Sequence, residues 1–259
     1  MKRVIRFFEN LLFPPRCVSC GEYMQKDILD PCNESLCPSC RLKWEKEKGE
    51  PCPDCGAEAA VCRCVSSAAK KSGVSDNIKL VNYYADRKTV GRQSILYMKK
   101  HANAKAFTFF AHQLSYSVKN YMDEKGWRGE QVVFCSIPRG RKNARVYGFD
   151  QAEVLAKRLA SFCGSDYCAL LSRRRGKEVE QKKLSADGRK QNVKGKFLVN
   201  PRRVAALEDI RAVFLVDDVV TTGASICSAA EALRGADLHG DVVVVSLART
   251  PMGRRKRPF

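Results

Sequence analysis

The stretch from residue 213 to residue 225, Val-Phe-Leu-Val-Asp-Asp-Val-Val-Thr-Thr-Gly-Ala-Ser, combines residue types that can hold a phosphorylated sugar. Its four leading apolar residues predict a buried parallel strand, and Asp217 and Asp218 follow where that strand would end. A small hydroxyl-rich turn comes next, before a predicted helix over residues 226–233. Backbone N–H groups and the dipole at a helix start favour a bound anion, and the paired acids suit sugar hydroxyls.

This order of strand, acid pair and turn resembles the phosphoribosyl pyrophosphate (PRPP) signature of type I phosphoribosyltransferases. The resemblance implies that Asp217 and Asp218 accept hydrogen bonds from the ribose hydroxyls. It also implies that the 5′-phosphate is held by a loop made of Thr221, Thr222, Gly223, Ala224 and Ser225. The alternative is an ordinary strand-turn-helix unit whose acids cap the next helix. No Gly-x-x-x-x-Gly-Lys-Ser/Thr pattern occurs, so the predicted phosphate site is not a P-loop.

Nine of the 13 cysteines lie between residues 17 and 64, and their spacing indicates metal binding. Two Cys-x-x-Cys pairs separated by sixteen residues predict a zinc site formed by Cys17, Cys20, Cys37 and Cys40. The next two pairs predict a second site, with one intervening residue in its last pair, formed by Cys52, Cys55, Cys62 and Cys64. Cys32 is left over. Since four thiolates fill the tetrahedral coordination of zinc, we expect any bound zinc to be structural.

A disulfide framework is the competing interpretation of these cysteines. The start of the chain does not fit a secretory signal, because Arg6, Glu9 and Asn10 interrupt its apolar positions and no small-residue cleavage site follows. Residues 1–13 instead predict a short docking helix. No apolar run approaches the roughly 18 residues needed to cross a membrane. We therefore expect a cytoplasmic protein without membrane insertion, whose reduced thiols bind zinc.

The formal net charge of +19 is unevenly distributed. Residues 1–70 contain 11 basic and 10 acidic residues, whereas residues 171–203 contain 12 basic and 3 acidic ones. A further basic cluster lies at residues 254–257. Such concentration favours phosphate-rich partners, either a small phosphorylated substrate or nucleic acid, with solvated surfaces as the alternative. Two zinc–thiolate sites would make the first part acidic, so that it can dock on the basic remainder.

Small polar residues at 66–76 predict a boundary between a zinc-ribbon domain at residues 1–70 and an α/β domain at residues 71–259. In the second domain the apolar pattern predicts strands at 78–84, 131–138 and 169–171, and helices at 89–100, 102–122 and 152–162. The basic loop after residue 138 includes Arg139 and Arg141, which we interpret as pyrophosphate ligands. Residues 172–200 form a long polar segment, where phosphoribosyltransferases have a mobile loop over the active site.

Over almost its whole length the chain resembles the ComF family of bacterial competence proteins. The matching motifs are Leu12-Phe-Pro-Pro-Arg-Cys17 before the zinc ribbon and Gly148-Phe149-x-Gln151 before the signature. Positions of the polar segment that match the family's spacing are Gln181, Leu184, Arg189, Asn192, Gly195 and Phe197. The resemblance implies a type I phosphoribosyltransferase fold, with a parallel sheet flanked by helices, and an N-terminal zinc ribbon. It also implies a role in importing transforming DNA as single strands, alongside a helicase-like partner.

Two positions depart from the family's Arg-Gly-Phe-Asn-Gln turn. Tyr147 replaces the arginine and Asp150 replaces the asparagine. Losing a bidentate anion donor and adding a negative charge should weaken any phosphate contact at this turn.

Two functional hypotheses follow from these patterns. As an enzyme, the chain would bind PRPP with Mg²⁺ on its pyrophosphate and act by positioning and electrostatics, with Asp217, Asp218 and Arg189 as catalytic residues. Arg139 and Arg141 would contact the leaving group. The rival is a non-catalytic module that uses the same fold to bind single-stranded DNA or a nucleotide. Nothing in the sequence identifies a site for an acceptor base.

Overall fold

A parallel sheet forms the centre of the molecule. The computed structural model describes residues 15–24, 35–139, 148–174, 195–207 and 209–252 of the chain. Five strands lie in the order β1-β7-β6-β2-β3, and every neighbouring pair is parallel. Their bounds are Asp76–Asn82 for β1, Val132–Ser136 for β2, Asp166–Tyr167 for β3, Ala212–Val220 for β6 and Asp241–Arg249 for β7.

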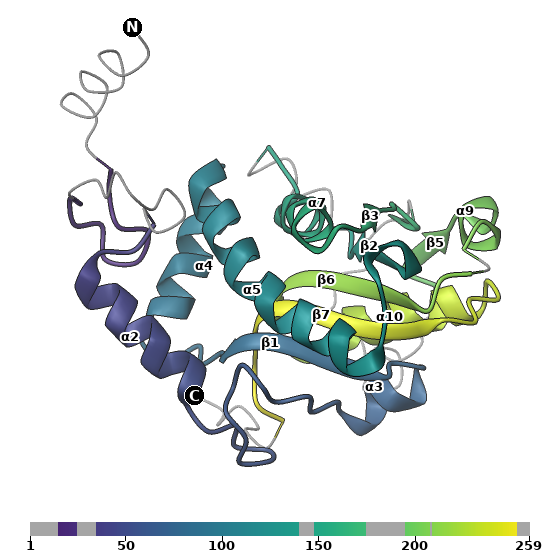
Figure 1. Cartoon of the computed structure of the whole chain (residues 1–259), viewed down its shortest axis with the longest axis horizontal. Helices are drawn as coiled ribbons and strands as arrows, with labels where there is room; N and C mark the ends of the chain where they lie inside the picture. Colours follow the sequence, from purple (N-terminus) through teal and green to yellow (C-terminus); the bar gives the residue numbers. More distant parts are fainter. Residues whose placement is uncertain (1–14, 25–34, 140–147, 175–194, 208, 253–259) are drawn as a thin grey trace, which may run out of the picture.

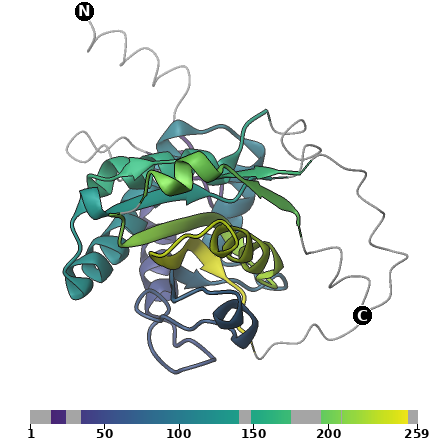
Figure 2. The same ribbon diagram turned by 90° about the vertical axis from the view of Figure 1, so that its right-hand side faces the viewer.

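Helices cover both faces of this sheet (Figures 1 and 2). Helices α5 (Ala104–Lys125) and α7 (Gln151–Cys163) pack on one face, and α3 (Ser67–Lys71) and α10 (Ala224–Arg234) pack on the other. This arrangement confirms the predicted α/β class with a parallel sheet flanked by helices. Near the β1 edge, α2 (Pro38–Gly49) packs against α4 (Val90–Lys100) and β1.

The remaining elements are short. A 3-10 turn, η2 (Gly129–Gln131), leads into β2. Strands β4 (Leu171–Arg173) and β5 (Phe197–Val199) form a separate antiparallel pair, followed by helix α9 (Pro201–Ala205). The two strands therefore flank the long polar segment, most of which lies outside the described residues. Among the described residues, no helix is long and apolar enough to span a membrane.

The sequence of β6 explains its central position. Val213 and Leu215 belong to the apolar cluster beneath α10, while Phe214 and Val216 belong to the cluster beneath α5 and α7. Side chains alternate between the two faces of a strand, so an unbroken apolar run is buried only where both faces are covered. β6 has β7 on one side and β2 on the other, which meets this condition.

Some elements differ from those predicted. The short strand predicted at 169–171 is replaced by β3 and by β4, which begins at Leu171. The linker at 66–76 contains helix α3, whose first turn is capped by the Ser66 hydroxyl. Helix α2 and strand β7 lie where no element was predicted. The docking helix predicted at residues 1–13 falls outside the described residues.

Candidate functional site

Two groups of four cysteines have the geometry of metal sites. In each group the four sulfur atoms all lie within 4.8 Å of one another, and the groups are the predicted ones: Cys17, Cys20, Cys37 and Cys40, then Cys52, Cys55, Cys62 and Cys64. Zn–S bonds of about 2.3 Å place sulfurs about 3.8 Å apart in a tetrahedron. The Cys20 and Cys37 sulfurs are 3.7 Å apart. Both groups can therefore hold structural zinc, in an N-terminal double zinc ribbon, with no coordination position left for a substrate.

The first cysteine pair of each group lies on the same type of turn. Isolated β-bridges join Arg16 to Tyr23 and Pro51 to Glu58, seven residues apart in both cases. Gly21 and Gly56, which follow the second cysteines, both have φ of +78°. A left-handed residue there closes each turn and aims both sulfurs inward, and glycine adopts this conformation without steric cost.

The zinc ribbon is docked on the α/β part through polar contacts as well as apolar ones. Trp44 of α2 is buried against Phe110 of α5, with ring centroids 5.2 Å apart. The Glu47 carboxylate accepts hydrogen bonds from the backbone N–H groups of Val90 and Gly91, 2.6 and 2.9 Å away. It thereby caps the start of α4 with a negative charge. The ribbon therefore packs on the rest of the chain through an aromatic contact and a helix cap, and the expectation that an acidic ribbon docks on a basic surface stays a prediction.

The acid pair lies inside β6 rather than after it. Strand β6 continues through Asp217 and Asp218 to Val220, in register with β7, so the prediction that the strand ends at Val216 was wrong. Pairing with β7 on one side extends the ladder beyond the apolar run. Asp218 is buried and Asp217 is partly accessible. Both nevertheless lie toward the carboxyl end of the central strands, where ligands bind in open parallel sheets.

Asp218 is held by two cations. Its Oδ2 atom lies 2.5 Å from Nη2 of Arg139, in the segment after β2, and 3.4 Å from Nζ of Lys99, on α4. Burial disfavours the Asp218 carboxylate, but the charges of Lys99 and Arg139 outweigh burial and lower its pKa. Burial and the adjacent Asp218 charge raise the pKa of Asp217 well above its usual value. Asp218 therefore ionises more readily than Asp217, as expected when two neighbouring carboxyl groups interact.

The loop after β6 is open to solvent. Thr221 and Thr222 are exposed, and Gly223, Ala224 and Ser225 are partly exposed. Gly223 has φ of +74°, a left-handed conformation that turns the chain sharply into α10. The Thr222 hydroxyl accepts a hydrogen bond from the Ala224 N–H at 3.4 Å, close to the limit for such a bond. An exposed hydroxyl-rich turn at the start of an eleven-residue helix has the local features of an anion site.

No family model matches the chain. Among curated proteins, it is similar to competence protein ComFC of Bacillus subtilis (strain 168), with 23% identity over 234 residues. The match covers 84% of this chain and 88% of that protein. The resemblance to the ComF family is confirmed. It rests on a match over most of both chains together with the two cysteine groups, not on one motif.

The structure gives Asp150 of the ComF-type turn a role that the sequence interpretation missed. Its Oδ1 accepts hydrogen bonds from the N–H groups of Ala152 and Glu153, so it caps α7. Its Oδ2 accepts the backbone N–H of Arg139 at 3.1 Å. Asn and Asp are about equally good caps. The change from asparagine is therefore compatible with the turn, and Asp150 positions Arg139. Tyr147 lies outside the described residues.

The structure brings together only part of the predicted site. Arg139 forms an ion pair with Asp218. The predicted phosphate loop, residues 221–225, directly follows strand β6, which carries Asp218. Arg141 and Arg189 lie outside the described residues, so their predicted roles stay predictions. Lys99 was not predicted. Its sequence context marks it only as one of the basic residues ending α4, and its contact with Asp218 arises from the packing of α4 beside the sheet.

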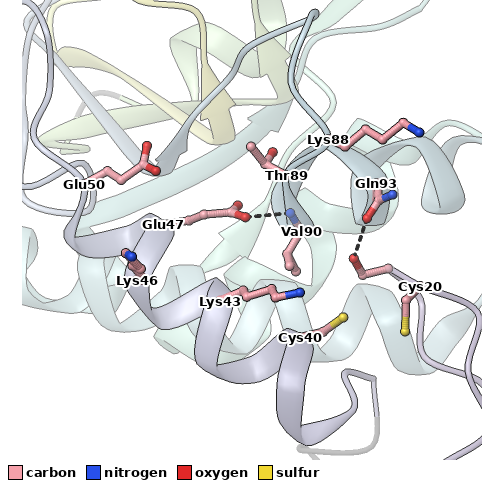
Figure 3. Close-up of a pocket in the computed structure, with 11 residues that line it drawn as sticks. Cys20, Cys40, Lys43, Lys46, Glu47, Glu50, Lys88, Thr89, Val90 and Gln93 are labelled. Atoms are coloured by element: carbon pink, nitrogen blue, oxygen red, sulfur yellow. Dashed lines mark hydrogen bonds between the residues drawn. The ribbon is translucent and has the colours of Figure 1, made fainter.

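A separate cavity of about 330 Å³ lies between α2 and the start of α4, beside the first cysteine group (Figure 3). Its lining includes Cys40, Lys43 and Lys88, as well as the carboxylates of Glu47 and Glu50. None of the residues 213–225 lines it. Its charges are mixed and its principal carboxylate, Glu47, is already bonded to α4. The cavity is therefore part of the ribbon's docking surface rather than an extension of the acid-pair site.

Proposed function

We propose that the chain binds PRPP, or a related phosphorylated ribose, through residues 213–225, and that it is a ComF-like phosphoribosyltransferase acting in DNA uptake during natural transformation. The observation that carries this proposal is the placement of Asp217 and Asp218 on the central strand, directly before the exposed loop that starts α10. The similarity to a competence protein supports the biological setting.

In this proposal the two carboxylates accept hydrogen bonds from the ribose hydroxyls, while the loop from Thr221 to Ser225 holds the 5′-phosphate. Arg139 and Lys99 lie against Asp218, within reach of an anion bound beside it. Arg139 would contact the pyrophosphate, together with Arg141. Mg²⁺ would reach the site on the pyrophosphate of PRPP, held mostly by substrate oxygens and water, and would neutralise part of its charge.

Binding of PRPP with Mg²⁺ to the full chain, measured by calorimetry, tests the site. The Asp217→Asn, Asp218→Asn double variant should bind at least about tenfold more weakly, because hydrogen bonds to charged groups contribute roughly 1.5–3 kcal/mol each. Asp166→Asn is the matched control, since Asp166 is exposed and pairs with Val133 at the opposite end of the sheet. Equal affinity of the double variant and the control would refute the ribose role.

Release of pyrophosphate from PRPP, assayed with a panel of nucleobases and related acceptors, separates an enzyme from a binder. Turnover that the double variant abolishes supports a transferase. PRPP binding without turnover supports the alternative, a module that binds nucleotides or single-stranded DNA. The formal charge of +19 is compatible with both outcomes, because PRPP and nucleic acid are both rich in phosphate. If the chain binds DNA, neutralising Arg173–Arg175 and residues 254–257 should reduce the salt dependence of DNA affinity.

A further inference from the structure

A lysine is fully buried at the edge of the sheet. Lys79, on β1, has 0% of its surface exposed. Ile78 and Leu80, on either side of it, face the core beneath α5, so Lys79 points to the opposite face of the strand. Its Nζ donates a hydrogen bond to the carbonyl of Ala59 at 2.8 Å, and no carboxylate of the described residues forms an ion pair with it. A buried ammonium group is costly unless an anion compensates it.

The second cysteine group lies where that anion is needed. Ala59 belongs to the turn that joins Cys55 to Cys62. The ammonium group of Lys79 therefore lies against the backbone of the loop that carries the second cysteine group. Four thiolates on Zn²⁺ carry a formal charge of −2, whereas four thiols carry none. A zinc-loaded group would therefore supply the compensating charge, and a zinc-free group of thiols would not.

A second cation approaches the same group from the neighbouring strand. Nη2 of Arg249, on β7, lies 4.0 Å from the Cys52 sulfur and 2.7 Å from Asp54 Oδ2. Arg249 is 5% exposed. The two strands that carry these cations, β1 and β7, are hydrogen-bonded neighbours. The second group thus lies over two buried cations from neighbouring strands, of which Arg249 is paired with Asp54 and Lys79 has no carboxylate partner among the described residues.

Both cysteine groups have a carboxylate beside them, and in the second group Asp54 Oδ2 lies 3.9 Å from the Cys52 sulfur. Oε2 of Glu22 lies 3.7 Å from the Cys20 sulfur and 3.9 Å from the Cys37 sulfur. A carboxylate so close does not offset the negative charge of a zinc–thiolate centre. The two groups share this turn and its carboxylate, and the second has in addition two buried cations, Lys79 and Arg249, against its loop.

We propose that Lys79, assisted by Arg249, is a positioning residue for the second metal centre: it holds that centre in its thiolate, zinc-bound form and couples zinc binding there to the sheet. The coupling runs both ways. Zinc compensates a charge buried in β1, and that charge stabilises the metal-bound thiolates. Loss of this zinc therefore weakens the β1 edge, whereas loss of the first zinc leaves Lys79 unaffected.

The Lys79→Met variant of the full chain tests the coupling, because methionine keeps much of the side-chain length and removes the charge. Thermal unfolding is measured with zinc bound and after chelation. The zinc-free variant should melt higher than the zinc-free wild type, which buries an uncompensated charge. With zinc bound, the variant should not melt higher than the wild type. The increase in Tm on zinc binding should therefore be several degrees smaller in the variant than in the wild type. A packing defect alone would lower both melting temperatures. An equal zinc-dependent shift in both proteins would overturn the proposal.

Timed cysteine alkylation, read by mass spectrometry, reports on each group separately and works on zinc-loaded protein. In Lys79→Met, the cysteines at positions 52–64 should be alkylated about tenfold faster than in the wild type, the effect expected when support around metal ligands is lost. Those at positions 17–40 should be unchanged. Lys43→Met is the control, because Lys43 is exposed beside Cys40. The proposal is wrong if, in the wild type, the cysteines at positions 52–64 are alkylated faster than those at positions 17–40. It is also wrong if Lys79→Met increases the alkylation rate of both groups alike.

Discussion

Two aspartate–arginine contacts lie toward the carboxyl end of the sheet, and they differ in what surrounds them. Asp54 and Arg249 are 7% and 5% exposed at their side chains, and Asp54 also accepts the Met252 N–H. Asp218 and Arg139 are 9% and 15% exposed, with Lys99 as a third member. The first contact is closed. The second has a further acid, Asp217, whose pKa burial raises.

This difference separates a structural ion pair from a candidate binding site. In the closed pair each charge is compensated by its partner, and the pair borders the structural cysteine group, so it offers no contact to an exchangeable ligand. The Asp218 group instead combines two cations with two acids and remains partly open, so its partners can be exchanged for ligand groups. Ionisable residues with conflicting neighbours are typical of functional sites. Substitutions at the closed pair should therefore cost more stability than substitutions in the Asp218 group.

Asp54→Asn should have the largest effect. The substitution leaves Arg249 buried without its carboxylate, and breaking a buried ion pair in this way costs about 3–5 kcal/mol. The free energy of unfolding of the zinc-loaded protein, obtained from denaturant titration, measures the loss. A change below about 1 kcal/mol would mean that Arg249 finds another partner, and the pair would not be closed as described.

Asp218→Asn should destabilise less, by about 1–3 kcal/mol. Lys99 and Arg139 have 29% and 15% of their side chains exposed, so both can turn toward water when the charge is removed. The same denaturant titration gives the comparison with Asp54→Asn. A loss as large as that of Asp54→Asn would show that the Asp218 group is as closed as the structural pair, contrary to this prediction.

Asp217→Asn should stabilise the protein at high pH, whereas the two preceding substitutions destabilise it. The pKa of Asp217 is raised in the folded state, so its contribution to stability is present at acidic pH and is lost as pH rises through that pKa. Asparagine does not ionise and avoids this loss. Melting curves at pH 5 and pH 8 should show the gain of the variant widening with pH. If the stability gain of the variant becomes smaller as pH rises, Asp218 rather than Asp217 has the raised pKa.

Glu45→Gln provides the lower limit of the series. Glu45 pairs with Lys48 at 2.7 Å on the surface of α2, and its side chain is 54% exposed. Exposed pairs of this kind contribute less than about 1 kcal/mol, and Lys48 keeps a second partner in Gln113. The expected change in unfolding free energy is within about 0.5 kcal/mol. A larger loss would mean that exposed ion pairs also contribute substantially to the free energy of unfolding of this protein.

The sequence predicts features that depend on local spacing. The cysteine groups were predicted correctly because each ligand pair is local and the spacing of the pairs is typical of zinc ribbons. Strand β6 was predicted from its apolar run, but its end was placed too early because pairing with β7 extends it past the acids. The run of valines at 242–245 carried a similar signal for β7 that was overlooked.

Contacts between distant segments could not be predicted. Lys99 reaches Asp218 only because α4 packs beside the sheet, and no local pattern in α4 indicates this. Lys79 is one lysine in a strand of mixed residues, and its burial depends on the ribbon that covers it. Asp150 precedes a predicted helix, a position typical of a cap, and this signal could have predicted its hydrogen bonds to the start of α7; the expectation that it weakens a phosphate contact stays a prediction.

The place of β7 in the sheet has a consequence for how the chain folds during synthesis. β7 is the last strand in sequence, yet it lies between β1 and β6, and in the described part of the chain β1 pairs with no other strand. Asp54 precedes its partner Arg249 by 195 residues, which at bacterial and eukaryotic rates of synthesis is roughly 10 to 40 seconds of translation. The cysteine turns can close locally in that interval. The sheet closes only when the final strand arrives, so a nascent chain stopped before it carries an unpaired β1, an edge prone to association with other chains.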